Sequence, residues 1–228
     1  VWGSLRNTGI ILLVALVILL PGAFFLAHLL SGHVRGGGAL RAMIFAPNVI
    51  APILIGLIWV FILDPHIGLV NSLLRTLGVA HPPVWIGGTS LSPWSIGVVY
   101  TWQTVGFIMT IFYAGIRMLP HDVMEAASLD GATGWQRLRY VTVPMLQETF
   151  GITTVLVVTG VFKIFELVFQ LTGGGPVHLS ETLVSYTYWM TFSNQKYGYG
   201  MALAVVISLL GVVVTVAQMA FMRRRRAS

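Results

Sequence analysis

The sequence predicts an all-α polytopic membrane protein, and its composition and hydropathy pattern support this fold class. Apolar residues make up 56% of the 228 residues and charged residues only 9%, whereas about a quarter of the residues in a soluble domain are charged. Five stretches are apolar enough and long enough to cross a bilayer, which takes about 20 helical residues. No segment between them is long enough for a soluble domain. We therefore expect a single transmembrane domain over residues 1–228.

The five stretches are expected to be helices, because a helix satisfies its own backbone hydrogen bonds in lipid. They cover residues 8–30, 42–63, 95–116, 149–171 and 199–222. Pro21, Pro47 and Pro52 lie inside the first two stretches and are expected to kink these helices without ending them. Only the fourth stretch contains charged residues, Lys163 and Glu166.

Basic residues concentrate on one side of the predicted membrane. Nine of the 13 lysines and arginines lie between the first and second stretches, between the third and fourth, or after the fifth. The positive-inside rule makes this side cytoplasmic, C-terminus included. The run from Arg223 to Arg226 then acts as an orientation signal that also attracts anionic membrane lipid, and no nucleic-acid partner is expected. Five helices with a cytoplasmic C-terminus leave Val1 outside, so a sixth helix, absent here, is expected to precede it.

Several kinds of chemistry have no support in the sequence. The chain has no cysteine, so it has no thiol or cysteine zinc site. We find no paired carboxylates, Ser-His-Asp arrangement or metal-ligand spacing. The Gly173–Gly175 run lacks the lysine and the helix start of a phosphate-binding loop. The sequence therefore predicts neither an enzyme nor a cofactor bound by this chain.

The segment from residue 118 to residue 146 predicts two short helices outside the membrane. Pro120 ends the preceding helix, and Asp122 with Glu125 three residues later resembles a capping arrangement for the first short helix. Gly131 is expected to end that helix after about two turns.

The second short helix is predicted by a capping box formed by Thr133 and Gln136, and Pro144 marks its end. Small residues on the first helix, Ala126 and Ala127, leave room for a partner backbone. A pair of helices lying on the membrane surface would also explain the amphipathic pattern of the segment.

This segment resembles the EAA loop of binding-protein-dependent ABC importer permeases. The pattern of that loop is EAA, three residues, G, nine residues, and I-x-L-P. Glu125, Ala126, Ala127, Gly131 and Pro144 match it in register, and valine replaces the isoleucine and the leucine. In the family this loop is the coupling helix that docks into a groove on the ATPase. The resemblance therefore implies that the first four of these residues contact an ATPase subunit.

The segments 64–74, 125–144 and 162–176 resemble the sugar-importer branch of this family, in particular its maltose and glycerol-3-phosphate types. The resemblance covers nearly the whole chain. It implies a permease subunit in a bacterial-type inner membrane that forms half of a translocation pathway. The implied partners are a second, related permease, a cytoplasmic ABC ATPase dimer that hydrolyses ATP, and an external binding protein that delivers a small solute, expected to be a sugar.

Lys163 and Glu166 lie three residues apart in the fourth predicted helix, so they share a face and can pair. Charges at membrane depth usually face a wet cavity, which favours a lining of the translocation pathway. An ion pair near the outer interface, with Lys163 extended to the headgroups, is the alternative. Gln103, Tyr100 and Asn48 are further pathway candidates, and hydrogen bonds between helices would explain them equally well.

A transporter driven by an ion gradient is the alternative function. It would favour buried carboxylates in several membrane helices, and only Glu166 meets this condition. A membrane anchor or assembly factor would have no ATPase-docking pattern. Neither alternative explains the EAA loop.

Overall fold

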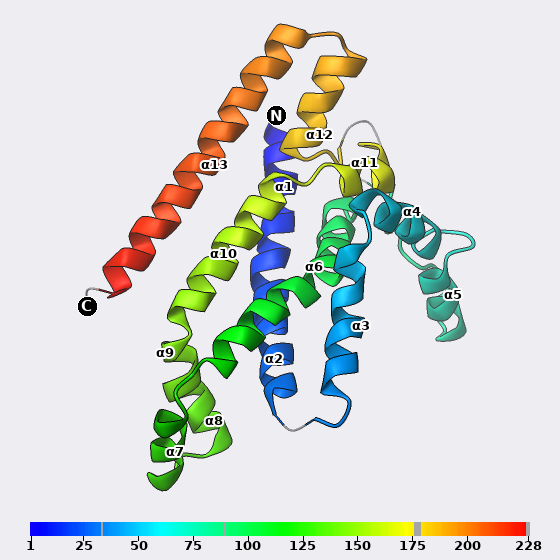
Figure 1. Ribbon diagram of the computed structural model, residues 1–228. Coiled ribbons are helices and arrows are strands. Elements are labelled where there is room, and N and C mark those ends of the chain that lie inside the picture. The colour runs from blue at the N-terminus through cyan, green and yellow to red at the C-terminus, as the bar shows by residue number, and fades with distance from the viewer. Residues whose placement is uncertain (33, 89, 176–178, 227–228) are drawn as a thin grey trace.

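The computed structural model describes residues 1–228 except 33, 89, 176–178 and 227–228, and the described part consists of helices and connecting segments without a strand (Figure 1). Three helices are long and apolar enough to cross a membrane. Two bent helix pairs raise this number to five when each pair is counted as one span. The all-α fold class is thus confirmed, with three to five candidate spans. The division into five spans stays a prediction, and two of the five predicted stretches have an unexpected shape.

The first span is one helix of 30 residues from Trp2 to Ser31. It consists of α1 (Trp2–Val14), the π-helical segment η1 (Ala15–Leu19) and α2 (Leu20–Ser31). Pro21 is the second residue of α2, two positions after the π segment, and a wider turn accommodates a residue that has no N–H to donate. The prediction that Pro21 does not end the helix is confirmed.

The second span is two helices, α3 (Gly37–Val49) and α4 (Pro52–Ile62), that meet at 97°. The prediction that Pro52 only kinks one helix over residues 42–63 is wrong, because Pro52 begins a new helix. Ile50 and Ala51 are extended, each with ψ near 135°. A residue that precedes proline is disfavoured in the helical conformation, which explains the break at Ala51. A short helix, α5 (Leu69–Thr76), follows in the next segment.

The third span, α6 (Ser92–Arg117), agrees with the predicted stretch 95–116 and lies at the centre of the fold. It packs against α1, α2 and α3. The contacts are close: a Cβ on Gly106 would collide with the Ile44 carbonyl of α3, and one on Gly97 would lie 3.0 Å from Val14 of α1. Small residues of this kind let membrane helices approach each other closely.

A pair of helices projects from one end of the molecule. It comprises α7 (His121–Leu129) and a second helix that runs through α8 (Gly134–Arg137), η2 (Leu138–Thr142) and α9 (Val143–Met145). The second helix meets α10 (Gln147–Phe162) at 68°. The turn between α2 and α3 lies at the same end of the molecule as α7 and α8 (Figure 1).

The fourth span is also broken. The prediction of one helix over residues 149–171 is wrong at residues 163–165, because α10 ends at Phe162 and α11 (Glu166–Thr172) begins after these three intervening residues. Neither proline nor glycine occupies the break. Phe165, with φ −133° and ψ −62°, turns the chain into α11.

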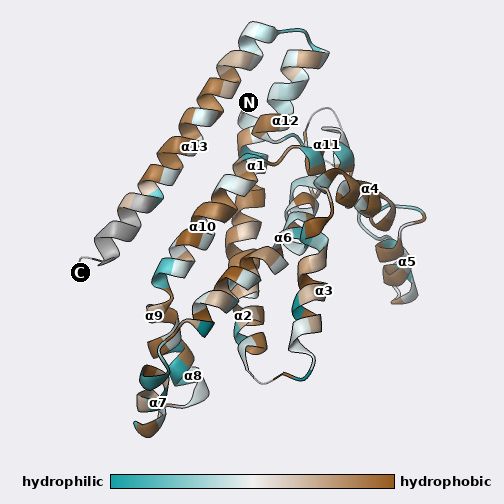
Figure 2. Ribbon diagram, viewed as in Figure 1, coloured by the Kyte–Doolittle hydropathy of each residue, from teal (hydrophilic) through white to brown (hydrophobic). Residues whose placement is uncertain are grey.

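The last part of the chain forms a hairpin of α12 (Leu183–Tyr188), η3 (Trp189–Ser193) and α13 (Tyr197–Arg226). The predicted stretch 199–222 lies within α13. Only 11% of the most apolar window of α13 is buried, and the helix is apolar along most of its length (Figure 2). Such a surface needs a non-aqueous environment, which a membrane provides.

Candidate functional site

A small pocket forms where the first turn of α4, the middle of α6 and the break between α10 and α11 meet. Its volume is about 150 Å³, and it is lined by Pro52, Tyr100, Gln103, Gly160 and residues 163–167. Four of the five residues predicted for a pathway therefore line one pocket: Tyr100, Gln103, Lys163 and Glu166. The fifth, Asn48, lies on α3 outside the lining.

Lys163 and Glu166 reach the pocket from two different helices. Lys163 is the C-cap of α10, and Glu166 is the first residue of α11. The prediction that the two share a face of one helix is wrong, because the break separates them. No ion pair joins them among the residues that the structure describes, and both side chains are exposed. A cation and an anion thus line the pocket without neutralising each other in a direct contact.

Gln103 lines the pocket and also makes a hydrogen bond to the bend between α3 and α4. Its side chain is buried, and its Nε2 donates to the Ile50 carbonyl at 3.3 Å. That carbonyl lies at the 97° bend, outside the hydrogen-bond ladders of α3 and α4. Gln103 therefore joins α6 to the bend, as the alternative of an interhelical hydrogen bond predicts.

Tyr100 lies across the pocket against Gly160 of α10. A Cβ on Gly160 would collide with the Tyr100 hydroxyl, so the absence of a side chain there makes room for the phenol. Gly160 and Pro52 also line the pocket and were not predicted from the sequence. A glycine in the middle of an apolar membrane helix is the signal that would have identified Gly160.

The lining combines an ammonium, a carboxylate, a phenol and an amide with the apolar Pro52, Phe165 and Leu167. A few polar groups among apolar walls are typical of pockets that bind small molecules. The described residues contain no group of three or more potential metal ligands. The arrangement therefore supports binding of a small polar molecule.

The second candidate region is the projecting segment of residues 118–146, here named the α7–α8 loop. Gly131 ends α7 with a left-handed φ of 77°. The Ala132 N–H donates to the Ala127 carbonyl at 3.0 Å, and the Gly131 N–H donates to the Ser128 carbonyl at 3.1 Å. These two bonds form a Schellman motif. The prediction that Gly131 ends the first short helix is confirmed.

The two predicted caps of the loop have different outcomes. The Thr133 N–H donates to Gln136 Oε1 at 2.7 Å, and the Gln136 N–H donates to Thr133 Oγ1 at 3.4 Å, so the capping box is confirmed. The capping arrangement of Asp122 and Glu125 is wrong. The helix starts at His121, one residue after Pro120, and no side chain caps it, because an N-cap residue must precede the first turn.

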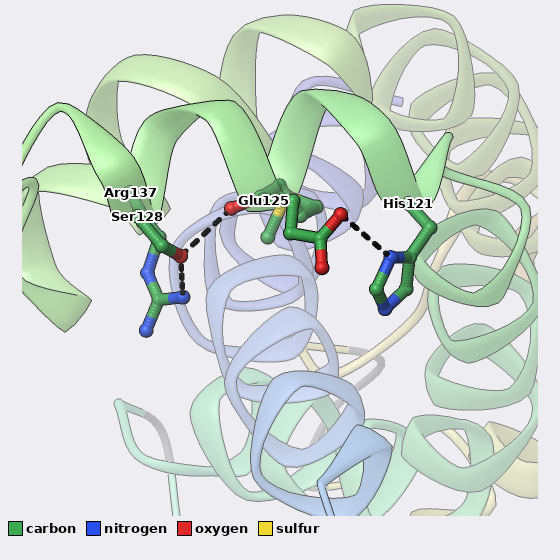
Figure 3. Close-up of polar contacts among 5 residues, drawn as sticks. His121, Glu125, Ser128 and Arg137 are labelled. Carbon is green, nitrogen blue, oxygen red and sulfur yellow. Dashed lines mark hydrogen bonds and ion pairs between the residues drawn. The ribbon is translucent and has the colours of Figure 1, made fainter.

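Contacts within the loop set the angle between its two helices. Arg137 Nη1 donates to Ser128 Oγ at 2.9 Å, and Ser128 Oγ donates to the Met124 carbonyl at 2.9 Å (Figure 3). Glu125 lies in the middle of α7, with one carboxylate oxygen 3.9 Å from His121 Nδ1 (Figure 3). Both side chains are largely exposed, so this pair contributes little to stability.

The helices α7 and α8 of the loop are uncovered. No residue of α7 or α8 is buried, and the side chains of Leu129 and Trp135 are 87% and 69% exposed. Exposed apolar side chains of this kind mark a contact surface for a protein partner or for a membrane, so both interpretations of this segment stay open. Ala126 is also exposed and Ala127 is half-buried, so partner atoms can approach α7 closely at these positions.

Comparisons with known proteins point to one family. Residues 20–227 match the family described as binding-protein-dependent transport system inner membrane component. The probable ABC transporter permease protein YurN of Bacillus subtilis is 32% identical over 223 residues, which cover 96% of this chain and 76% of YurN. The sn-glycerol-3-phosphate transport system permease protein UgpA of Agrobacterium fabrum is 30% identical, with 97% of this chain and 75% of UgpA covered.

A solved structure has the same fold. The crystal structure of a bacterial alginate ABC transporter, in complex with an alginate pentasaccharide-bound periplasmic protein, matches this chain with a TM-score of 0.87 and 20% identity. The match covers 97% of this chain and 78% of that chain. The broken second and fourth spans therefore occur in a fold that a known transporter also adopts.

Proposed function

The chain belongs to the family of binding-protein-dependent transport system inner membrane components, and from this premise we propose that it forms half of the translocation pathway of an ATP-driven importer. Its family is one of ABC transporter permeases, which are membrane components and not enzymes. The observation that carries the proposal is the α7–α8 loop. It presents Glu125, Ala126 and Ala127 on an uncovered helix that Gly131 ends with a left-handed turn.

The proposed partners follow from the family and from the surface of the chain. An ABC ATPase dimer covers the α7–α8 loop and hydrolyses ATP, since this chain has no nucleotide-binding motif of its own. A second, related permease forms the other half of the pathway. An external binding protein, on which the family depends by its description, delivers the solute to the opposite end of the molecule.

The pocket is the proposed place of solute contact, with Lys163, Glu166, Tyr100 and Gln103 in its wall. Asn48, on α3, is proposed to line the pathway outside this pocket. The proposed solute is a carbohydrate or a related polyhydroxylated molecule. The names of a glycerol-3-phosphate system and an alginate transporter among the similar proteins support this class. An ion-gradient transporter has no support from these similarities.

The proposed orientation places the α7–α8 loop and the C-terminus in the cytoplasm. The loop and the turn between α2 and α3 lie at one end of the molecule (Figure 1), and their basic residues favour that side. Single cysteines in this cysteine-free chain test the orientation in intact cells. An impermeant thiol reagent should label Ser90→Cys and Asn194→Cys, both at exposed positions, and should spare the exposed Gly134→Cys. Labelling of residue 134 from outside contradicts the orientation.

The docking role of the α7–α8 loop is tested by Ala127→Trp in the purified complex of both permeases and the ATPase. A large side chain at this half-buried position should prevent close contact between α7 and the ATPase. The matched control is Tyr140→Trp, at a position of the same loop that is 70% exposed and already aromatic.

The measurements are the amount of ATPase that copurifies with the permeases and the hydrolysis rate stimulated by the loaded binding protein. We expect Ala127→Trp to lower both and the control to leave both near the parent values. The affinity of the isolated binding protein for solute should not change in either variant. Full ATPase retention together with full stimulated hydrolysis in Ala127→Trp removes the main support for the proposed function.

A further inference from the structure

A buried polar cluster lies outside the pocket and joins three parts of the chain. Asn7, Thr8, Thr182 and Ser185 are each at most 6% exposed. They come from α1, from the segment that precedes α12, and from α12 itself. Buried amides and hydroxyls cost free energy unless they are hydrogen-bonded. The bonds of this cluster therefore favour one relative arrangement of the three parts.

Thr182 connects this cluster to the break between α10 and α11. Its hydroxyl donates to the Ile164 carbonyl at 3.0 Å. Ile164 lies inside the break, after α10 has ended and before α11 begins, and it lines the pocket. A carbonyl at such a position needs a partner from elsewhere in the fold. Thr182 supplies that partner from a position 18 residues further along the chain.

The Thr182 side chain is itself held by a capping box at the start of α12. The Thr182 N–H donates to Ser185 Oγ at 2.9 Å, and Thr182 Oγ1 accepts from the Ser185 N–H at 3.5 Å. The hydroxyl oxygen therefore accepts from α12 while its proton points to Ile164. This double use leaves little rotational freedom for the hydroxyl.

The N-terminal helix anchors the same segment on both sides of Thr182. Asn7 Nδ2 donates to the carbonyls of Leu179 and Glu181, at 2.6 and 2.9 Å. The Leu183 N–H donates to Thr8 Oγ1 at 3.2 Å. Continuous hydrogen bonds thus run from α1 through residues 179–183 to Ile164, the residue next to Lys163.

We propose that Thr182 is a positioning residue for the solute pocket and that Asn7 and Thr8 hold it in place. The bond to Ile164 stabilises the break between α10 and α11, and the break is what sends Lys163 and Glu166 to the pocket from two separate helices. The inference rests on the proposed function of the pocket as part of the solute pathway. It adds residues that contact neither the solute nor the ATPase.

Thr182→Val removes the hydroxyl and keeps the β-branched shape, whereas Thr182→Ser keeps the hydroxyl. Thr187→Val is the matched control, because the Thr187 hydroxyl donates only to the Leu183 carbonyl of its own helix, at 2.9 Å. The variants are compared in the complete transporter with its ATPase and binding protein. We expect solute transport in Thr182→Val to fall about fivefold, the effect of one net hydrogen bond, at unchanged ATPase retention. Thr182→Ser and Thr187→Val should transport solute within about twofold of the parent, because neither removes the hydrogen bond to Ile164.

A second measurement reports on the break directly. Phe165→Cys places a thiol in the pocket lining, and its labelling rate depends on the conformation of the break whether or not solute passes there. We expect Thr182→Val to change this labelling rate and Thr187→Val to leave it unchanged. Asn7→Ala removes the anchor at the other end and should change the labelling rate in the same direction by a smaller factor. It provides the test if the transporter with Thr182→Val does not assemble.

The two measurements separate the possible failures. An unchanged labelling rate in Thr182→Val and in Asn7→Ala overturns the positioning role. A changed labelling rate with full solute transport overturns the assignment of the pocket to the pathway, on which the inference rests. Loss of transport in the Thr187→Val control attributes the effect to the general stability of α12 and also overturns the positioning role.

Discussion

The hydrogen bonds within the α7–α8 loop join residues close in sequence, whereas those at the pocket, where α10 and α11 are separated by the break, join residues far apart in sequence. In the loop, the capping box joins residues three positions apart, and the contact from Arg137 to Ser128 spans nine positions. At the pocket, the contact from Thr182 to Ile164 spans 18 positions and the one from Gln103 to Ile50 spans 53. The loop is therefore a local structure, while the pocket exists only when distant helices pack.

The two regions also differ in what covers them. The α7–α8 loop has no buried residue in α7 or α8 and offers its surface to a partner. The pocket is formed within the membrane domain around the buried Gln103. Changes in the pocket should therefore alter transport at constant ATPase retention, and changes in the loop should alter ATPase retention first. Two variants in the pocket and two in the loop test this separation.

The largest effect is expected for Lys163→Met in the pocket. Methionine keeps the apolar stem but removes the ammonium, and hydrogen bonds to a charged group contribute about 1.5–3 kcal/mol. We expect solute transport to fall about ten- to a hundredfold, the factor that corresponds to this energy, with normal ATPase retention. Lys196→Met, at the other lysine of the chain, which is exposed and outside the pocket lining, is the control. Normal uptake kinetics in Lys163→Met would show that the pocket lies off the pathway.

The next effect concerns the contact between Gly160 and Tyr100. Gly160→Ala places a methyl group where the Tyr100 hydroxyl lies, and such overpacking costs about 1–3 kcal/mol. Transport should fall about tenfold, a factor within this range. Adding Tyr100→Phe should restore much of it, because the ring carbon that carries the hydroxyl is 3.6 Å from the new Cβ, an ordinary contact distance. If the double variant transports no better than Gly160→Ala alone, this contact does not shape the pocket.

Both breaks that form the pocket were missed from the sequence, for two different physical reasons. Pro52 was a local signal, since the preceding residue is pushed out of the helical conformation, but a proline in a membrane helix can also produce only a kink. The break after Lys163 has no local signal. It depends on the Ile164 carbonyl finding a partner in Thr182, and no short window of sequence contains that contact.

The elements predicted correctly are those whose causes are local. The apolar run of α6 defines its ends to within a few residues, and Gly131 with the Thr133 and Gln136 pair defines the turn of the α7–α8 loop. The pathway residues were selected for polarity within apolar stretches, which is also local. That criterion found Lys163, Glu166, Tyr100 and Gln103 but not the geometry that brings them together.

A smaller effect is expected in the loop, where two glycines three residues apart can be compared. Gly131 has a left-handed φ of 77°, a conformation that costs alanine about 1–2 kcal/mol. Gly134 lies in a normal helical turn with open space around it. Gly131→Ala should weaken copurification of the ATPase about fivefold, at the lower end of this cost, while Gly134→Ala should not. Equal ATPase retention in the two variants would show that the left-handed turn is not needed for docking.

The smallest effect is expected at the capping box of the same loop. Thr133→Ala removes a side-chain acceptor from the start of α8, a change that costs about 0.5–2 kcal/mol in exposed helices. The loss should stay local, because Thr133 and Gln136 bond to each other and are both exposed. The backbone amides of Gln136 and Arg137, which donate to Thr133, should therefore exchange with solvent about fivefold faster, as a local opening free energy lower by about 1 kcal/mol requires. Thr133→Ser keeps the acceptor and should exchange at the parent rate. ATPase retention in Thr133→Ala should fall less than in Gly131→Ala, because the Schellman turn that ends α7 remains intact. If solute transport falls while ATPase retention and amide exchange remain at the parent values, the loop and the pocket are coupled more directly than their separate bonds imply.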